Sequence, residues 1–234
     1  MLPAELIDHI FSFLQEDTLA LKACSKAHPL YSRLAERHLY THIVSDSKVS
    51  NDILDNPHLL DYPSTLEIRS HLFTRSQPAI SFISVIPQMS NLVSLKICDP
   101  CPFYKRNEFI SMLRNCLQQS SFQELHLSHH IRFSFSVLDD AKNIKHLTLS
   151  HCYADENEPI SSSPSSQLSL DTLIFSDYHN SYFHRWAVRW VTRLTSLELR
   201  QLSLDQNWTV FSELLIACSN SLTKLHLSMR VRSM

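Results

Sequence analysis

The sequence of 234 residues contains no glycine, whereas an average chain has roughly 7 %. Glycine gives the backbone access to positive φ and lets it approach phosphate groups closely. A Walker-type phosphate loop, a dinucleotide-binding fingerprint and a G-x-S-x-G nucleophile elbow all depend on it. The absence of glycine therefore argues against three large classes of enzyme.

An excess of charge of one sign is also missing, because 21 Lys and Arg stand against 23 Asp and Glu. Binding to nucleic acid or an anionic membrane requires a basic patch, which this balance does not provide. The six cysteines are spread along the chain, unlike those of a small disulfide-rich domain. The opening MLPAELIDHIF contains Glu5 and Asp8 and lacks the basic region of a secretory signal. We therefore expect a protein of a reducing compartment, cytoplasmic and/or nuclear.

One uncharged stretch, 76–95, is long enough to cross a bilayer. It contains two prolines and the amide side chains of Gln77, Gln88 and Asn91, which hydrocarbon would not satisfy. We interpret it as a short amphipathic helix, a loop and a strand of a soluble protein.

The first forty residues are expected to form three helices. Residues 3–14 contain Leu6, Ile10, Phe13 and Leu14 at the spacing of one helical face. Asp17 is a suitable N-cap for a second helix from Thr18 to about Ser25, and an apolar stripe in 30–39 predicts a third. So small a module cannot bury all of these side chains alone, and an exposed apolar surface would mark an interaction site. The alternative is an ordinary helical cap on a larger core.

The segments LPAELIDHIFSFL, LALKACS and LYSRLAERHLY resemble an F-box, although that family often has Trp at the position of Tyr31. The matching residues are Leu2, Pro3, Glu5, Leu6, Ile10, Leu14, Leu19, Leu21, Cys24 and Ser25. The resemblance covers 2–40 and implies an F-box over 1–40, which docks the small adaptor subunit of SCF-type ubiquitin ligases and, through it, a cullin. The apolar anchors that it implies are Leu2, Pro3, Leu6, Ile10, Phe11, Leu14 and Leu19. Some of these must also hold the helices together.

A short alternating motif recurs after residue 40. Its copies are TLEIRS (65–70), SLKICD (94–99), ELHLSH (124–129), HLTLSH (146–151), TLIFSD (172–177), SLELRQ (196–201) and KLHLSM (224–229). Aligned on the second apolar residue, they lie 22 to 30 residues apart, which resembles the period of leucine-rich repeats. THIVSD (41–46) predicts one more strand. Of the positions where that family usually has Asn or Cys, only Cys152 fits, so the repeats are divergent.

Helix-forming segments separate the strands at 106–119, 182–194 and 207–218. The shortest interval, between Leu127 and Leu149, leaves room only for an irregular or single-turn connection. The predicted fold is α/β, a small three-helix F-box followed by a curved leucine-rich-repeat solenoid over 41–234. Its seven to eight strands are expected to be parallel with the helices outside.

The segment 154–167, ADENEPISSSPSSQ, is acidic and then rich in Ser and Pro, which predicts a mobile loop. It is either a phosphorylation or partner-contact loop or a tolerated surface insertion.

Side chains alternate along a strand, so the residue between the two buried apolar positions points outward. These outward residues form a column, and the predicted target-binding face is its part made up of Glu67, Lys96, His126, Thr148, Ile174 and Glu198. His226 continues the same column. Its centre is uncharged, so we expect a target segment without strong net charge across His126, Thr148 and Ile174. Binding through the 154–167 loop is the alternative.

The sequence therefore predicts a non-enzymatic substrate receptor, without cofactor or metal, that binds an adaptor and a target protein. A ligase-independent repeat scaffold is the first alternative. The second is a metal-dependent or thiol hydrolase with its site at Cys98 and Cys101, but four convergent zinc ligands are not evident. The further candidate ligands are His126, His129, His130, His151 and Cys152. We also expect Ser221–Ser228 to form an exposed sheet edge, and the protein to self-associate or to be truncated relative to its relatives.

Overall fold

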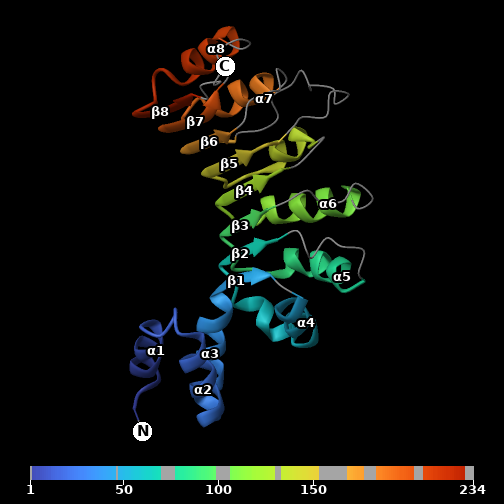
Figure 1. Cartoon of the computed structure of the whole chain (residues 1–234), viewed down its shortest axis with the longest axis vertical. Helices are drawn as coiled ribbons and strands as arrows, with labels where there is room; N and C mark the ends of the chain where they lie inside the picture. The colour runs from blue at the N-terminus through green and yellow to red at the C-terminus, as the bar shows by residue number, and fades with distance from the viewer. Residues whose placement is uncertain are drawn as a thin grey trace, which may run out of the picture.

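The computed structural model describes residues 2–45, 47–69, 77–98, 106–129, 133–152, 168–176, 183–202 and 208–229. The chain has an α/β fold with one eight-stranded parallel sheet, whose strands follow each other in chain order. Figure 1 shows the strands stacked as an elongated ladder, with helices along one side and a separate helical group at the N-terminal end. The predicted loop 154–167 lies outside the described residues.

The N-terminal module consists of α1 (Ala4–Ser12), α2 (Thr18–Ala27) and α3 (Pro29–Thr41), close to the predicted ranges. Its core consists of Ile7, Phe11, Leu21 and Ala35, a cluster distinct from the core beneath the sheet. Leu6, Ile10 and Phe13, whose spacing indicated one apolar face of the first helix, are all exposed. Ile7 and Phe11 lie on a second apolar face, and they are buried.

Polar contacts join α1 to α3 beside this core. The His38 ring lies between the two helices, with its Nε2 2.8 Å from Asp8 Oδ1 and its Nδ1 3.3 Å from Gln15 Nε2. Arg37 approaches the same carboxylate at 3.6 Å. The edge of the His38 ring also meets Phe11, with ring centroids 6.4 Å apart. The orientation of α1 is therefore set by both apolar and polar contacts.

The predicted N-cap of α2 is confirmed, because the backbone N–H of Ala20 donates to Asp17 Oδ1 at 2.9 Å. We expect Asp17→Ala to destabilise the helical module by about 1 kcal/mol, since capping side chains contribute about that much. Amide hydrogen exchange over 18–27 should accelerate accordingly. Asp17→Ser, which keeps a capping oxygen, is the matched control. Equal exchange rates in the wild type and the alanine variant would contradict the assignment.

The strands form at the predicted motifs, including the additional strand before the first repeat. They are β1 (His42–Ser45), β2 (Thr65–Ile68), β3 (Ser94–Ile97), β4 (Glu124–Ser128), β5 (His146–Ser150), β6 (Thr172–Ser176), β7 (Ser196–Leu202) and β8 (Lys224–Met229). Their registers align the apolar positions into two columns that face the helices. The first column is Ile43, Leu66, Leu95, Leu125, Leu147, Leu173, Leu197 and Leu225. The motif therefore fixes the strand register as well as the strand positions.

Helical segments connect the strands and cover one face of the sheet (Figure 1). They are α4 (Ser47–Asp55), η1 (Pro57–Asp61), α5 (Gln77–Val85), η3 (Ile86–Gln88), α6 (Arg106–Leu117), η5 (Phe135–Asp140), α7 (Phe183–Trp190) and α8 (Trp208–Cys218). The shortest interval, between Leu127 and Leu149, contains the 3-10 segment η5, in agreement with the short connection predicted there. Helix α4 was not predicted, although its Ile53 is buried in the main core.

The uncharged stretch 76–95 forms helix α5, the turn η3 and the start of β3 over its described part, 77–95, as expected. Within the described ranges, no helix is long and apolar enough to cross a membrane.

Candidate interaction surfaces

The outer face of the helical module is apolar. We define the apolar docking face as the large hydrophobic residues there that are between 43 and 78 % exposed, namely Leu2, Leu6, Ile10, Phe13 and Leu19. They make up more than half of the exposed large hydrophobic residues in the described part of the chain. A cluster of this kind on so small a module is typical of a protein-binding surface.

The sequence-predicted anchors divide between this face and the module's interior. Leu2, Leu6, Ile10 and Leu19 lie on the face, and Pro3, the residue before α1, is exposed. Leu14 is half-buried against the module's core. Phe11 is only 4 % exposed, so it packs inside the module and does not belong to the surface. Phe13 was not among the predicted anchors, because the F-box resemblance did not include it.

Helix α1 can present this face because it carries two apolar stripes. Ile7, Phe11 and Leu14 have the i, i+4, i+7 spacing and turn inward. Leu6, Ile10 and Phe13 have the same spacing, displaced by one residue, and turn outward. Since the inner stripe already fills the module's core, the outer stripe remains available to a partner.

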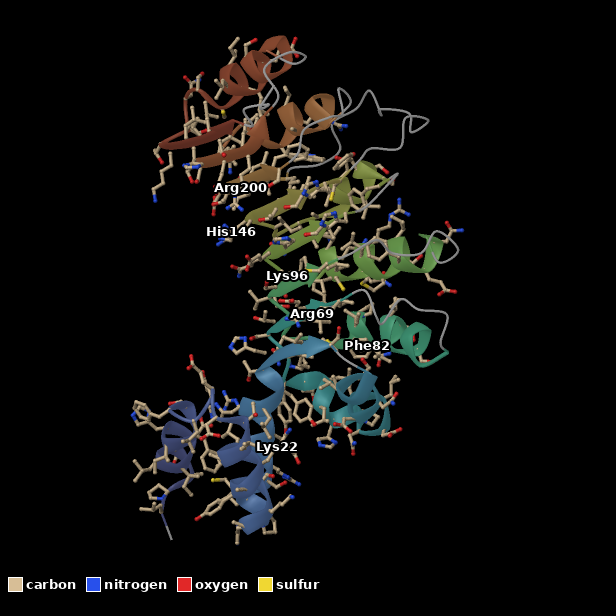
Figure 2. All side chains as sticks on the ribbon, viewed as in Figure 1. Lys22, Arg69, Phe82, Lys96, His146 and Arg200 are labelled. Carbon is tan, nitrogen blue, oxygen red and sulfur yellow. The ribbon has the colours of Figure 1, made fainter. Side chains whose placement is uncertain are left out.

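The second surface is the open face of the sheet, on the side away from the helices. Lys96, His146 and Arg200 project from this side (Figure 2). The predicted target-binding residues are brought into one row by the strand registers, each paired with the next. The row is Val44, Glu67, Lys96, His126, Thr148, Ile174, Glu198 and His226. Their predicted alignment is thus observed, while their role in binding a target stays a prediction.

Both ends of this row contain ion pairs. Glu67 Oε1 accepts a hydrogen bond from Arg69 Nε at 2.8 Å, and its Oε2 accepts from Lys96 Nζ at 3.1 Å. These hydrogen bonds, that of Arg69 above all, lower the pKa of the Glu67 carboxyl below its usual range. At the other end, Arg200 Nε donates to Glu198 Oε1 at 2.8 Å and lowers the pKa of Glu198 in the same way. The charged residues are therefore largely occupied with one another.

The centre of the row is polar and uncharged. Burial, and then the nearby Lys96 charge, lower the pKa of His126, which favours its neutral form. Its Nε2 lies 2.9 Å from Ser128 Oγ on the same strand. Ser128 pairs in register with Ser150, and Ser150 pairs with Ser176. Ser128 and Ser176 are buried, so this line of hydroxyl side chains is sheltered from solvent.

The backbone beyond two of these serines adopts an unusual conformation. His129 and His151 have φ of 60° and 53°, in the left-handed region that glycine would occupy most easily. Their rings stack with centroids 4.6 Å apart and planes 6° from parallel. Non-glycine residues held in this region often mark functional sites. The sequence contains a signal for this pair of histidines, because Leu-x-Leu-Ser-His occurs at 125–129 and again at 147–151. The spacing of the apolar residues alone did not reveal it.

The candidate metal and thiol residues lie only partly within the described ranges. Cys98 is half-buried just beyond β3, while Cys101 and His130 lie outside the described residues. Within the described ranges, no group of three or more His, Cys, Asp or Glu side chains could hold a metal ion. Burial raises the pKa of Cys116 to about 12, so its thiol stays protonated and unreactive.

The last strand lies at the end of the sheet, as predicted. Among the residues that the structure describes, β8 pairs with β7 alone. Leu225 is 46 % exposed, whereas its counterparts from Ile43 to Leu197 are at most 3 % exposed. Self-association through this edge stays a prediction.

The chain matches no protein-family model and no curated protein.

Proposed function

We propose that this protein is the substrate-recognition subunit of an SCF-type cullin–RING ubiquitin ligase. Residues 1–40 act as an F-box that docks the adaptor, and residues 41–234 act as a divergent leucine-rich-repeat solenoid that captures a target protein. The chain itself performs no chemistry under this proposal, because ubiquitin transfer belongs to other subunits.

The observation that carries the proposal is the apolar docking face. Leu2, Leu6, Ile10 and Leu19 are positions of the F-box resemblance, and all four are exposed. None of the four belongs to the core of the helical module, in which Ile7 and Phe11 are the buried residues of α1. Exposed apolar side chains cost solubility unless a partner buries them, so a binding role accounts for their arrangement.

The repeat region supports the second half of the proposal. Parallel strands in chain order at intervals of 22 to 30 residues, with helices along one side, are typical of leucine-rich repeats. Repeat proteins commonly bind partners on an extended strand face. Here that face carries the aligned row from Val44 to His226.

The experiment that tests the proposal is co-purification of the full chain with the adaptor. We expect a Leu6→Ala/Ile10→Ala variant to lose at least about 2 kcal/mol of binding free energy, or roughly 30-fold in affinity, because buried interface anchors are worth that much. The sheet should stay folded, since both side chains lie outside its core.

A Val93→Ala/Ile216→Ala variant is the matched control, because it removes two exposed aliphatic side chains from the repeat region. It should bind the adaptor at the wild-type level. Wild-type adaptor binding by the Leu6/Ile10 variant would disprove the docking assignment. A wild-type chain that captures a protein partner but no adaptor would indicate the ligase-independent scaffold.

A further inference from the structure

The centre of the open sheet face has a chemistry distinct from its two ends. We call it the neutral floor and define it by His126, Thr148, Ile174, Ser128, Ser150 and Ser176, on β4 to β6. Among the described residues, no ion pair involves any of these six side chains. Instead they offer hydroxyl groups, a largely neutral imidazole and one aliphatic surface.

The charges around the floor do not favour the binding of an acidic ligand. Arg69 and Lys96 are held by Glu67, and Arg200 is held by Glu198. A phosphate or carboxylate that approached these cations would also meet the carboxylate already bound to them, which repels it. Glu124, exposed on β4 beside His126, adds a further negative charge that repels an anion.

The floor also has features that suit a ligand. Ile174 is half-buried on a face where solvent favours polar residues, and it lies in register between Thr148 and Glu198. The stacked His129 and His151 rings lie just beyond Ser128 and Ser150. Their left-handed backbone conformation costs about 1 kcal/mol or more each, a cost usually found at binding or catalytic sites.

We propose that the neutral floor binds an extended, uncharged segment of the target protein, with hydroxyl or amide groups over Thr148 and Ser150, which are half-buried, and an aliphatic side chain against Ile174. This inference rests on the proposed function, because it assigns the chemistry of the target that the receptor captures. Strands lie about 4.8 Å apart, so the distance from Lys96 on β3 to Glu198 on β7 is about 19 Å, which an extended peptide spans in about six residues. The charged ends would then flank the bound segment and limit its register.

The test uses the full chain and a synthetic library of random dodecapeptides that includes phosphoserine among its building blocks. We expect the enriched peptides to carry a net charge near zero, with Ser, Thr, Asn or Gln beside an aliphatic residue. Their affinity, measured by fluorescence polarisation, should change little with salt, because few charges form the contact. Enrichment of acidic or phosphorylated peptides, or of none, would overturn the inference.

Two floor variants and one control variant locate the binding site. Ile174→Asp should lower the affinity for the enriched peptides at least about tenfold, since it places a carboxylate in the uncharged centre. Ile216→Asp places the same charge on the exposed side of α8 and should leave the affinity unchanged. Thr148→Asp repeats the test at a second position, and thermal melting identifies any variant that does not fold. Affinity within twofold of wild type for both floor variants would exclude the floor as the site.

Adaptor co-purification on the same preparations separates this inference from the proposed function. Neutral peptides bound at the floor without any adaptor would refute the ligase role and leave the inference standing. Adaptor bound normally, together with selection of acidic peptides, would refute the inference alone.

Discussion

Replacing Phe11 with alanine is expected to unfold the N-terminal helical module while the eight-stranded sheet stays folded. Phe11 is 4 % exposed and lies among only a few buried side chains, with Ile7, Leu21 and Ala35. Large-to-small replacement of a buried Phe costs about 3–5 kcal/mol, which is about as much as a core of this size supplies in total. The sheet has its own core from Ile43 to Cys218 and should not depend on this residue.

Amide hydrogen exchange read by mass spectrometry would show the effect region by region, with fast exchange over 4–41 and unchanged exchange in the strands. Phe13→Ala is the matched control, because it removes the same side chain two residues away at a position that is 76 % exposed. It should leave exchange unchanged and weaken only adaptor binding. Similar exchange in the two variants would show that the assignment of the inner and outer stripes is wrong.

The second large effect is expected at Trp190, a fully buried side chain that joins α7 to η5. Its indole Nε1 donates to Asp139 Oδ1 at 3.4 Å, and its ring centroid lies 6.2 Å from that of Phe135. Trp190→Ala should lower stability by about 3–5 kcal/mol through loss of burial and creation of a cavity. For a chain of this length, that corresponds to a fall in Tm of roughly 10 °C.

Thermal unfolding followed by circular dichroism measures this change. Trp190→Phe, which keeps an aromatic ring against Phe135 but loses the N–H donor, should show a clearly smaller fall in Tm. A Trp190→Ala variant that melts within about 2 °C of wild type would mean that the α7–η5 contact contributes little to stability.

The sequence predicted the sheet well because its evidence is repeated. Each copy of the motif places two apolar residues around an outward one, and the copies agree on register from Glu67 to His226. Helix α4 was missed because it is a single polar segment, in which few apolar side chains, such as Ile53, mark the buried side. Strands shared by several repeats are thus easier to predict than a helix that occurs once.

The error in α1 has a different origin. The stripe through Ile7 and Phe11 and the stripe through Leu6, Ile10 and Phe13 have the same helical period. Periodicity shows that a face is apolar, but only the position of α3 decides which of two such faces is inside. Phe11, a predicted anchor, is therefore buried, whereas Phe13, which was not among the predicted anchors, is exposed.

The junction between the module and the sheet has no linker. Helix α3 ends at Thr41 and β1 begins at His42, while the carbonyl of Thr41 accepts a hydrogen bond from the N–H of Ser64 at 2.9 Å. Tyr40, in the last turn of α3, packs against the core of the sheet. The two surfaces are therefore joined by continuous secondary structure that resists bending.

For the proposed receptor, this junction fixes the distance between the ligase and the captured target. The centre of the neutral floor, on β5, lies four strand spacings from β1, or about 19 Å along the sheet. A captured protein would be held at a fixed offset from the ligase, made up of this distance and the length of the helical module, and would not swing on a tether. Only those target lysines that this fixed offset brings toward the ubiquitin-charged enzyme would be modified, so the length of the ladder would select the acceptor site.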